Sequence, residues 1–268
     1  MTDLHIVRLV LDRRALLRAV RSGRRPIMDE GYLLHAGLSA LFATSPDERA
    51  KVPLHTFAVD DTLPATRQRP DSVYLLAYSD LDEGALTDRM AGELRGMVRQ
   101  CATRGVPEVA AGTHASFRVR ACPVVRTRQA PPGEDRAEAG RGRSREVDAW
   151  LAYRFARWEE QPPLREGHPF ERGGVEWSER ERVYGEWLGR ELGRDGAASL
   201  AQPATLAQFQ RVKLHRRGGK SRKSPERPDV VLEGSLRVDD AGAFRALLRR
   251  GIGRHRAFGF GMLLLRRG

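Results

Sequence analysis

The pattern of apolar and polar positions in the N-terminal part of the chain predicts six structural elements. Residues 4–11 are apolar and rich in β-branched side chains, which indicates a strand. In residues 30–42 and 81–103, apolar positions recur at helical spacing and predict two helices. The remaining expected elements are strands at residues 54–59, 72–79 and 106–111. The resulting order, β-α-β-β-α-β, is that of a ferredoxin-like unit.

The C-terminal part of the chain predicts a second set of the same kind. Apolar and polar residues alternate in residues 117–122, which indicates a strand. Helical spacing predicts helices at residues 145–159 and 178–192. The remaining expected elements are strands at residues 209–216, 230–238 and 258–265 and a short helix at residues 239–250. These elements form another β-α-β-β-α-β set if residues near 160–205 are an insertion.

The length of the chain agrees with this division. A chain of 268 residues suits two small domains, and a hydrophobic content of 40% is enough to form their cores. We therefore expect an α+β fold of two tandem ferredoxin-like domains, with an insertion in the second. The boundary is expected near Ala115, which gives an N-terminal domain of residues 1–115 and a C-terminal domain of residues 116–268.

Several classes of protein are disfavoured by the composition. No apolar run approaches the roughly 18 residues that a membrane span needs, and the N-terminus does not read as a signal peptide. Cys101 and Cys122 lie far apart without a CxxC motif, which supports neither a disulfide framework nor a zinc site. The histidines show no metal-ligand spacing. A cytoplasmic protein without a metal or other cofactor is therefore expected.

The charge of the chain indicates its partner. Lys and Arg number 47 against 35 Asp and Glu, a net charge of +12, which favours a polyanion such as nucleic acid. The basic residues are clustered before the first predicted helix, in a linker and in two later segments. They include Arg24 and Arg25; Arg126, Arg128, Arg136, Arg141, Arg143 and Arg145; Arg211, Lys213, Arg216, Arg217, Lys220, Arg222 and Lys223; and Arg249, Arg250, Arg254 and Arg256. A solvated surface would explain one cluster, but repeated clusters favour a binding surface.

Tyr32 and His35 are the first candidates for chemistry. At positions i and i+3 they share one face of the first predicted helix, close to the basic pair Arg24 and Arg25. A phenol and an imidazole placed there could transfer protons beside a bound phosphate. On spacing alone, a helix that buries an aromatic residue and a hydrogen-bonded histidine is the commoner explanation. The other histidines, His55 among them, are expected to be structural or exposed.

Residues 251–261, GIGRHRAFGFG, form a glycine-rich segment near the C-terminus. This segment follows a predicted helix rather than a strand, so it is not a dinucleotide-binding fingerprint, and it lacks the Gly-Lys-Ser/Thr of a P-loop. It offers backbone N–H groups interleaved with Arg254 and Arg256, an arrangement that suits a phosphate backbone held at close approach. The alternative is a glycine-rich turn that leads into an edge strand.

Four segments together are similar to one known family. They are the glycine-rich segment, the strand and turn at residues 233–240, the strand Phe117-Arg118-Val119-Arg120-Ala121-Cys122-Pro123, and Tyr32-Leu33-Leu34-His35. On these segments the chain resembles the CasE-type CRISPR repeat endoribonucleases, which are built from two ferredoxin-like domains. The resemblance covers both halves but is thin between residues 126 and 205, and Cys122 stands where that family usually has Asn.

The resemblance implies a function and a site. It implies an endoribonuclease that binds the stem-loop of a CRISPR repeat in precursor RNA and cuts at the 3′ base of the stem by attack of a 2′-OH, without a metal ion. Tyr32 and His35 would be the catalytic pair, and Arg24 or Arg25 would stabilise the transition state. By the same resemblance, the protein would stay on its product and join the other subunits of a CRISPR surveillance complex.

The predicted RNA-binding residues come from the basic clusters and from the glycine-rich segment. They are Arg24, Arg25, Arg211, Lys213, Arg216, Arg217, Lys220, Arg222, Lys223, Gly251, Gly253, Arg254, Arg256 and Gly259. Two other functions fit the same composition: a non-catalytic RNA-binding subunit on the same scaffold, and a general RNA chaperone. A binding subunit would not depend on His35, and a chaperone would show no preference for a stem-loop.

Overall fold

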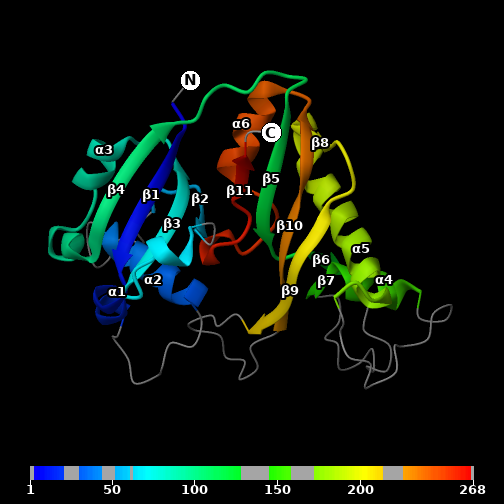
Figure 1. Cartoon of the computed structure of the whole chain (residues 1–268), viewed down its shortest axis with the longest axis horizontal. Coiled ribbons are helices and arrows are strands. Elements are labelled where there is room, and N and C mark those ends of the chain that lie inside the picture. The colour runs from blue at the N-terminus through cyan, green and yellow to red at the C-terminus, as the bar shows by residue number, and fades with distance from the viewer. Residues whose placement is uncertain are drawn as a thin grey trace.

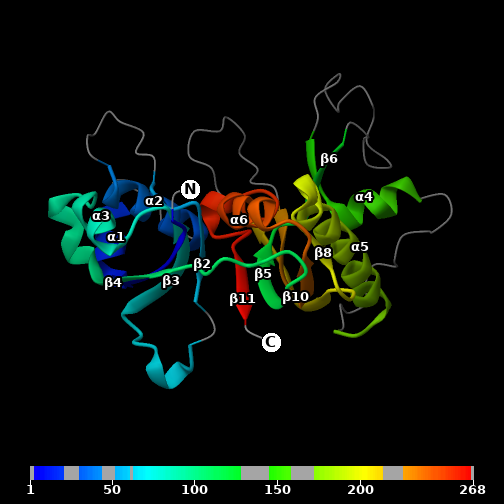
Figure 2. The same cartoon turned by 90° about the horizontal axis from the view of Figure 1, so that it is seen from above.

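The structure is a computed structural model that describes residues 3–20, 30–43, 52–60, 63–127, 145–157, 172–213 and 226–266. It contains two larger antiparallel sheets that lie next to each other along the long axis of the molecule (Figure 1). Figure 2 shows α2 and α6 on the same side of the two sheets, and β3, β5 and β11 are drawn below these helices. The described residues contain no helix with the length and apolar character that crossing a membrane requires.

The first sheet and its helices make up the N-terminal domain. Its strands are β1 (His5–Asp12), β2 (Thr56–Val59), β3 (Ser72–Ser79) and β4 (Val98–Gly105), in the order β2-β3-β1-β4. Its helices are α1 (Arg13–Val20), α2 (Glu30–Leu41), α3 (Glu83–Asp88) and the 3₁₀-helix η2 (Gly92–Met97), with a further 3₁₀ turn, η1 (Ala65–Arg67), before β3. Buried leucines of α2 pack with Leu9 and Leu75 of the sheet in one hydrophobic core.

Two predictions for this domain were wrong. Residues 81–103 do not form a single helix but are divided between α3, η2 and β4, and residues 106–111 are not a strand. The reason is tertiary: β4 pairs with β1, with Gln100 opposite Val10 and Cys101 opposite Leu9. The hydrogen bonds between β4 and β1 outweigh the helical spacing of the apolar residues in this segment. Cys101 therefore lies half-buried on a strand rather than in the core of a helix.

The second sheet and its helices make up the C-terminal domain. Its strands are β5 (His114–Ala121), β8 (Ala198–Leu200), β9 (Thr205–Lys213), β10 (Glu226–Val238) and β11 (Leu263–Arg266). Their order is β11-β5-β10-β8, and β9 also pairs with β10. The helices are α4 (Ala149–Ala156), α5 (Val175–Leu192), α6 (Ala241–Arg250) and the short η3 (Arg194–Gly196) and η4 (Arg256–Phe258). A separate two-stranded sheet pairs β6 (Val124–Thr127) with β7 (Arg145–Asp148).

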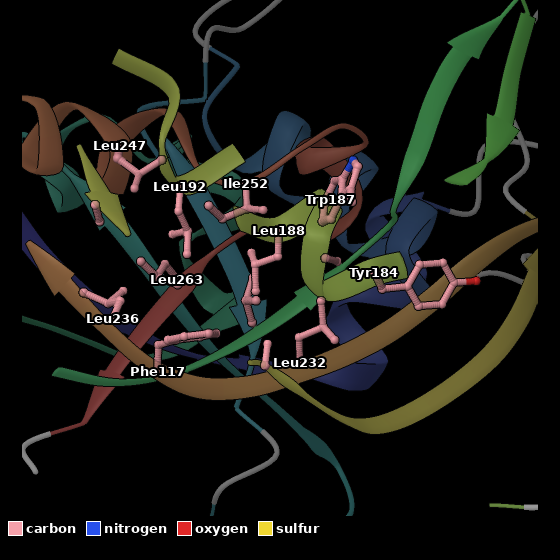
Figure 3. Packing of buried hydrophobic residues seen from close by; sticks show 14 of the residues in the cluster. Phe117, Tyr184, Trp187, Leu188, Leu192, Leu232, Leu236, Leu247, Ile252 and Leu263 are labelled. Atoms are coloured by element: carbon pink, nitrogen blue, oxygen red, sulfur yellow. The ribbon is translucent and has the colours of Figure 1, made fainter. Parts of the chain in front are cut away.

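The helix that covers the second sheet is α5. Its residues Tyr184, Leu188 and Leu192 pack with Phe117 and Leu232 of the sheet (Figure 3). This helix lies inside the segment that the sequence analysis set aside as an insertion. The helix predicted at residues 145–159 is instead a strand, β7, followed by α4, and these elements together with β6 are additions to the six-element unit.

Both domains are thus ferredoxin-like, as the sequence predicts. In each, a β-α-β-β-α-β order produces an antiparallel sheet with its helices on one face. The division into residues 1–115 and 116–268 stays a prediction, and Ala115 itself lies within β5.

The two domains contact each other directly. Leu4, Ala58 and Tyr78 of the N-terminal domain belong to the same hydrophobic core as the C-terminal sheet. The Tyr78 hydroxyl donates a hydrogen bond of 2.9 Å to the carbonyl oxygen of Leu263, and burial raises the pKa of Tyr78. Because α6 and the glycine-rich segment also contact this face, the N-terminal and C-terminal residues that the resemblance singles out are brought together.

Candidate active site

Helix α2 carries the predicted catalytic pair. Leu34 and Leu38 point into the core of the N-terminal domain, while Tyr32 and His35 lie half-buried beside them. The centroid of the His35 ring is 5.4 Å from that of Phe258, which belongs to the glycine-rich segment of the other domain. Burial lowers the pKa of His35 below its usual value. At neutral pH the imidazole is therefore neutral and can accept a proton.

The backbone of the glycine-rich segment is strongly turned. Gly251, Gly253 and Gly259 all have positive φ, at 70°, 68° and 84°. A Cβ at Gly253 would lie 2.7 Å from the Trp187 ring, so the segment is packed closely as well as strongly turned. The segment then reaches across to β2, where Gly259 lies against Phe57.

Glu146 of β7 holds this segment in place. Its carboxylate accepts a hydrogen bond of 2.8 Å from Arg254 and lies 3.1 Å from Nε2 of His255. Arg227 of β10 lies 3.6 Å away on the same carboxylate. Partial burial raises the pKa of Glu146, but His255 and Arg254 lower it further, so that the net shift is downward. Glu146 therefore stays ionised and holds the glycine-rich segment against β7 of the same domain.

A cleft of about 730 Å³ lies between the two domains. The N-terminal domain contributes α2 and β2 to it, and the C-terminal domain contributes α6 and the glycine-rich segment. Its polar and ionisable lining residues are His35, Ser39, His55, Arg249, Arg250 and Arg256. Among the described lining residues, every ionisable side chain is basic. Such a cleft suits a phosphate group placed next to an imidazole.

His55 occupies this cleft although sequence reasoning ranked it low. Its Nε2 lies 2.9 Å from Oδ2 of Asp80, and Oδ1 of Asp80 accepts a hydrogen bond of 2.8 Å from Nε of Arg249. Partial burial raises the pKa of Asp80, but its hydrogen bonds with Arg249 and His55 lower it overall. The sequence contained no signal for this group, because His55 and Asp80 meet through the pairing of β2 with β3 and Arg249 reaches them from the other domain.

The other predicted residues are distributed unevenly around the cleft. Arg256 lines the cleft directly, while Tyr32, one turn before His35, is not among its described lining residues. Arg211 and Lys213 are exposed on β9. A second cavity of about 460 Å³ is lined by Glu30 at the start of α2 and by Gln208 and Gln210 of β9, so this strand runs close to α2.

Half of the predicted RNA-binding set falls in segments whose structure is not described. These residues are Arg24, Arg25, Arg216, Arg217, Lys220, Arg222 and Lys223, which lie outside the described residues. Within the described ranges, no group of three or more His, Cys, Asp and Glu side chains is arranged to hold a metal ion.

Comparison with known proteins agrees with the fold. A family model described as CRISPR associated protein matches residues 4–267. A structure of the CRISPR endoribonuclease Cse3 bound to a 19-nucleotide RNA is similar over 98% of this chain and 99% of that chain, with 20% identity and a TM-score of 0.57. Cse3 of Thermus thermophilus, bound to an RNA that represents a pre-cleavage complex, is 21% identical over the same shares of the two chains, also with a TM-score of 0.57.

A third solved structure extends the comparison. Cas6e from Escherichia coli K-12 is 20% identical over 98% of this chain and 99% of that chain, with a TM-score of 0.51. At these identities the structures show a shared fold. Among curated proteins, no sequence matches significantly. Because the family model spans both domains, together with α2 and the glycine-rich segment, the chain belongs to the family of CRISPR-associated proteins.

Proposed function

We propose that this protein is an endoribonuclease that binds the stem-loop of a CRISPR repeat in precursor RNA and cuts at the 3′ base of the stem. The observation that supports this most directly is the position of His35. A half-buried imidazole lines a cleft whose other ionisable lining residues, among those described, are all basic. A scissile phosphate bound there would have cations around its oxygens and a proton acceptor next to it.

The proposed reaction is an intramolecular transesterification. The 2′-oxygen of the RNA forms a bond to the adjacent phosphorus, and the bond from phosphorus to the 5′-oxygen breaks. The products are a 2′,3′-cyclic phosphate and a 5′-OH. Because the nucleophile belongs to the RNA, the protein has to align it, transfer protons and stabilise charge, and the reaction needs no metal ion.

The residues on α2 would divide these tasks. His35 accepts the proton of the 2′-OH, since burial lowers its pKa and keeps the imidazole neutral at neutral pH. Tyr32 lies one turn earlier on the same helix and orients the reacting group. The arginines that line the cleft, Arg249, Arg250 and Arg256, stabilise the negative charge of the transition state.

The basic segments would carry the RNA toward this cleft. Arg211 and Lys213 are exposed on β9, which passes close to the start of α2, and further basic residues follow directly in the sequence. An A-form stem is read mainly through its phosphates and shape, which suits such a segment. Two of the similar structures contain Cse3 with bound RNA. By the family resemblance, the protein would remain on its product in the cytoplasm as a subunit of a surveillance complex.

The test is cleavage of the cognate repeat RNA in EDTA, with mapping of the product ends. We expect cleavage without added metal, a 2′,3′-cyclic phosphate on the upstream product, and no cleavage of RNA with a 2′-deoxy nucleotide at the scissile position. His35→Ala should slow single-turnover cleavage by about 10²–10⁴-fold, the usual contribution of a general base, while affinity stays close to wild type.

A matched control separates catalysis from folding. His114 is exposed on β5 and is not among the described residues that line the cleft, so His114→Ala should cleave normally. If His35→Ala cleaves at the wild-type rate, the catalytic assignment of His35 is refuted. If the wild-type protein binds the repeat RNA without cutting it, the protein is a non-catalytic RNA-binding subunit. A requirement for magnesium, or cleavage of the 2′-deoxy substrate, would contradict the mechanism.

A further inference from the structure

The proposed cleavage requires two proton transfers. One group must take the proton of the 2′-OH, and another must give a proton to the 5′-oxygen as the bond to phosphorus breaks. A neutral His35 suits the first task, but it cannot at the same moment perform the second. The donor has to face the same cleft, and Tyr32 is not among the described residues that line it.

His55 meets this requirement by its position. It lines the cleft together with His35, although it comes from the segment before β2 rather than from α2. Its backbone N–H donates a hydrogen bond of 2.8 Å to the carbonyl oxygen of Tyr78, which fixes its main chain to β3. Its side chain is 32% exposed, so the ring is held in place and still open to a ligand.

The partner of His55 fixes the orientation of its ring. Nε2 lies 2.9 Å from Oδ2 of Asp80, a distance at which an N–H donor and a carboxylate acceptor are paired. This pairing places a proton on Nε2 and directs Nδ1 away from the carboxylate. Asp80 is itself held by Arg249 through its other oxygen, so it cannot turn away from the imidazole without breaking a second hydrogen bond.

We propose that His55 is the proton donor to the leaving 5′-oxygen, with Asp80 as its positioning residue. This inference rests on the proposed function. The protonated imidazole gives its Nδ1 proton to the 5′-oxygen as the bond from phosphorus to that oxygen breaks. His35 takes the proton of the 2′-oxygen as the bond from that oxygen to phosphorus forms. No proton is gained or lost in the step, and exchange with water then restores both imidazoles.

The charged groups around His55 are consistent with this role. They are Asp80 at the end of β3, Arg249 and Arg250 of α6, Arg256 of η4, and His35 of α2. Asp80 provides a counter-ion for the imidazolium, while the arginines provide the cations that a phosphate needs. The other explanation of His55 is structural: it could merely extend the contact between Asp80 and Arg249 across the two domains.

A leaving group that needs no proton separates these explanations. In an RNA whose bridging 5′-oxygen is replaced by sulfur, the thiolate leaves without protonation. We expect His55→Ala to slow cleavage of the normal RNA by about 10²–10⁴-fold at saturating protein. The same variant should cleave the sulfur-bridged RNA at close to the wild-type rate. His35→Ala should be slow on both substrates, because the 2′-OH still has to lose its proton.

A second variant of His55 gives an independent readout. His55→Gln keeps an N–H group toward Asp80 but cannot donate the proton, so it should fold normally and show the same reduction in rate. This variant keeps the test valid if His55→Ala is unstable. Asp80→Asn should lower the rate with the normal substrate more than with the sulfur-bridged one.

The results that would overturn the inference are distinct from those that overturn the proposed function. Normal cleavage by both His55 variants, or equal slowing on the two substrates, assigns His55 a structural role. In either case, slow cleavage by His35→Ala would leave the proposed function intact. Normal cleavage by His35→Ala would refute the catalytic assignment of His35, and absence of cleavage by the wild-type protein would refute the proposed function itself.

Discussion

Replacing Gly261 by alanine tests how the glycine-rich segment is held. Gly261 has a φ of 84°, and a Cβ there would lie 2.2 Å from the carbonyl oxygen of Ile252. Left-handed backbone costs a residue with a side chain about 1–2 kcal/mol. The carbonyl of Ile252 cannot retreat freely, because the N–H of the same residue donates a 2.8 Å hydrogen bond to Gly261. Overpacking of this kind costs about 1–3 kcal/mol, so Gly261→Ala should lower the free energy of unfolding by about 2–5 kcal/mol.

Gly112 provides the matched control. It also has a φ of 84°, but a Cβ there would meet nothing within 4 Å. Gly112→Ala should therefore show only the backbone cost, about 1–2 kcal/mol. Urea denaturation followed by tryptophan fluorescence measures both variants, and Gly261→Ala should also cleave repeat RNA more slowly because its segment lines the cleft. Equal destabilisation of the two variants would refute the close packing that is assigned to this segment.

Three further predictions concern charge. The cleavage rate should rise from acid to neutral pH with a midpoint below 6.5, because burial lowers the pKa of His35 and the neutral imidazole is the active form; a midpoint above 6.5 would contradict this role. Charge removal at Arg216, Arg217 and Lys220 should flatten the slope of log affinity against log salt by about one unit for each RNA phosphate that is no longer neutralised. An unchanged slope would mean that the RNA does not contact this segment. Glu146→Ala should lower the free energy of unfolding by about 1–3 kcal/mol, since it leaves partly buried donors unpaired, and a stability equal to wild type in thermal unfolding would argue against that interaction.

The sequence pattern predicted most strands because short apolar runs rich in β-branched and aromatic residues favour strands. The strand predicted at residues 72–79 is β3, and the helix predicted at residues 30–42 is α2 within one residue. The pattern failed at residues 81–103, where apolar spacing fits a helix but pairing with β1 decides the structure. Helical spacing can be recognised within one segment alone, whereas the formation of a strand also depends on the neighbouring strand with which it pairs.

The candidate site was predictable in its local parts and not in its tertiary parts. Tyr32 and His35 are one helical turn apart, so spacing and family resemblance could find them. Asp80 and Arg249 are 169 positions apart, and His255 and Glu146 are 109 positions apart. The first contact depends on how the two domains pack and the second on how β7 meets the glycine-rich segment within the C-terminal domain, and nothing in one sequence reports such tertiary packing.

The cleft exists only where the two domains meet, so their contact should control the reaction. Tyr78 is 3% exposed, and its hydroxyl donates a 2.9 Å hydrogen bond to Leu263 of the other domain. Tyr78→Phe removes this donor from a buried carbonyl, which costs about 1–3 kcal/mol. Because the carbonyl of Tyr78 also holds the backbone of His55, a shift of this strand would reach the cleft and slow cleavage.

Tyr74 lies on the same strand and allows the comparison. Its hydroxyl bonds only within the N-terminal domain, accepting from the N–H of Arg69 at 3.1 Å and donating to the carbonyl of Arg67 at 3.3 Å. Tyr74→Phe should leave both stability and the single-turnover rate close to wild type, while Tyr78→Phe lowers both. Equal cleavage rates in the two variants would mean that the hydrogen bond between the domains stabilises the fold without positioning the groups of the cleft. The site would then depend on the side chains of each domain separately.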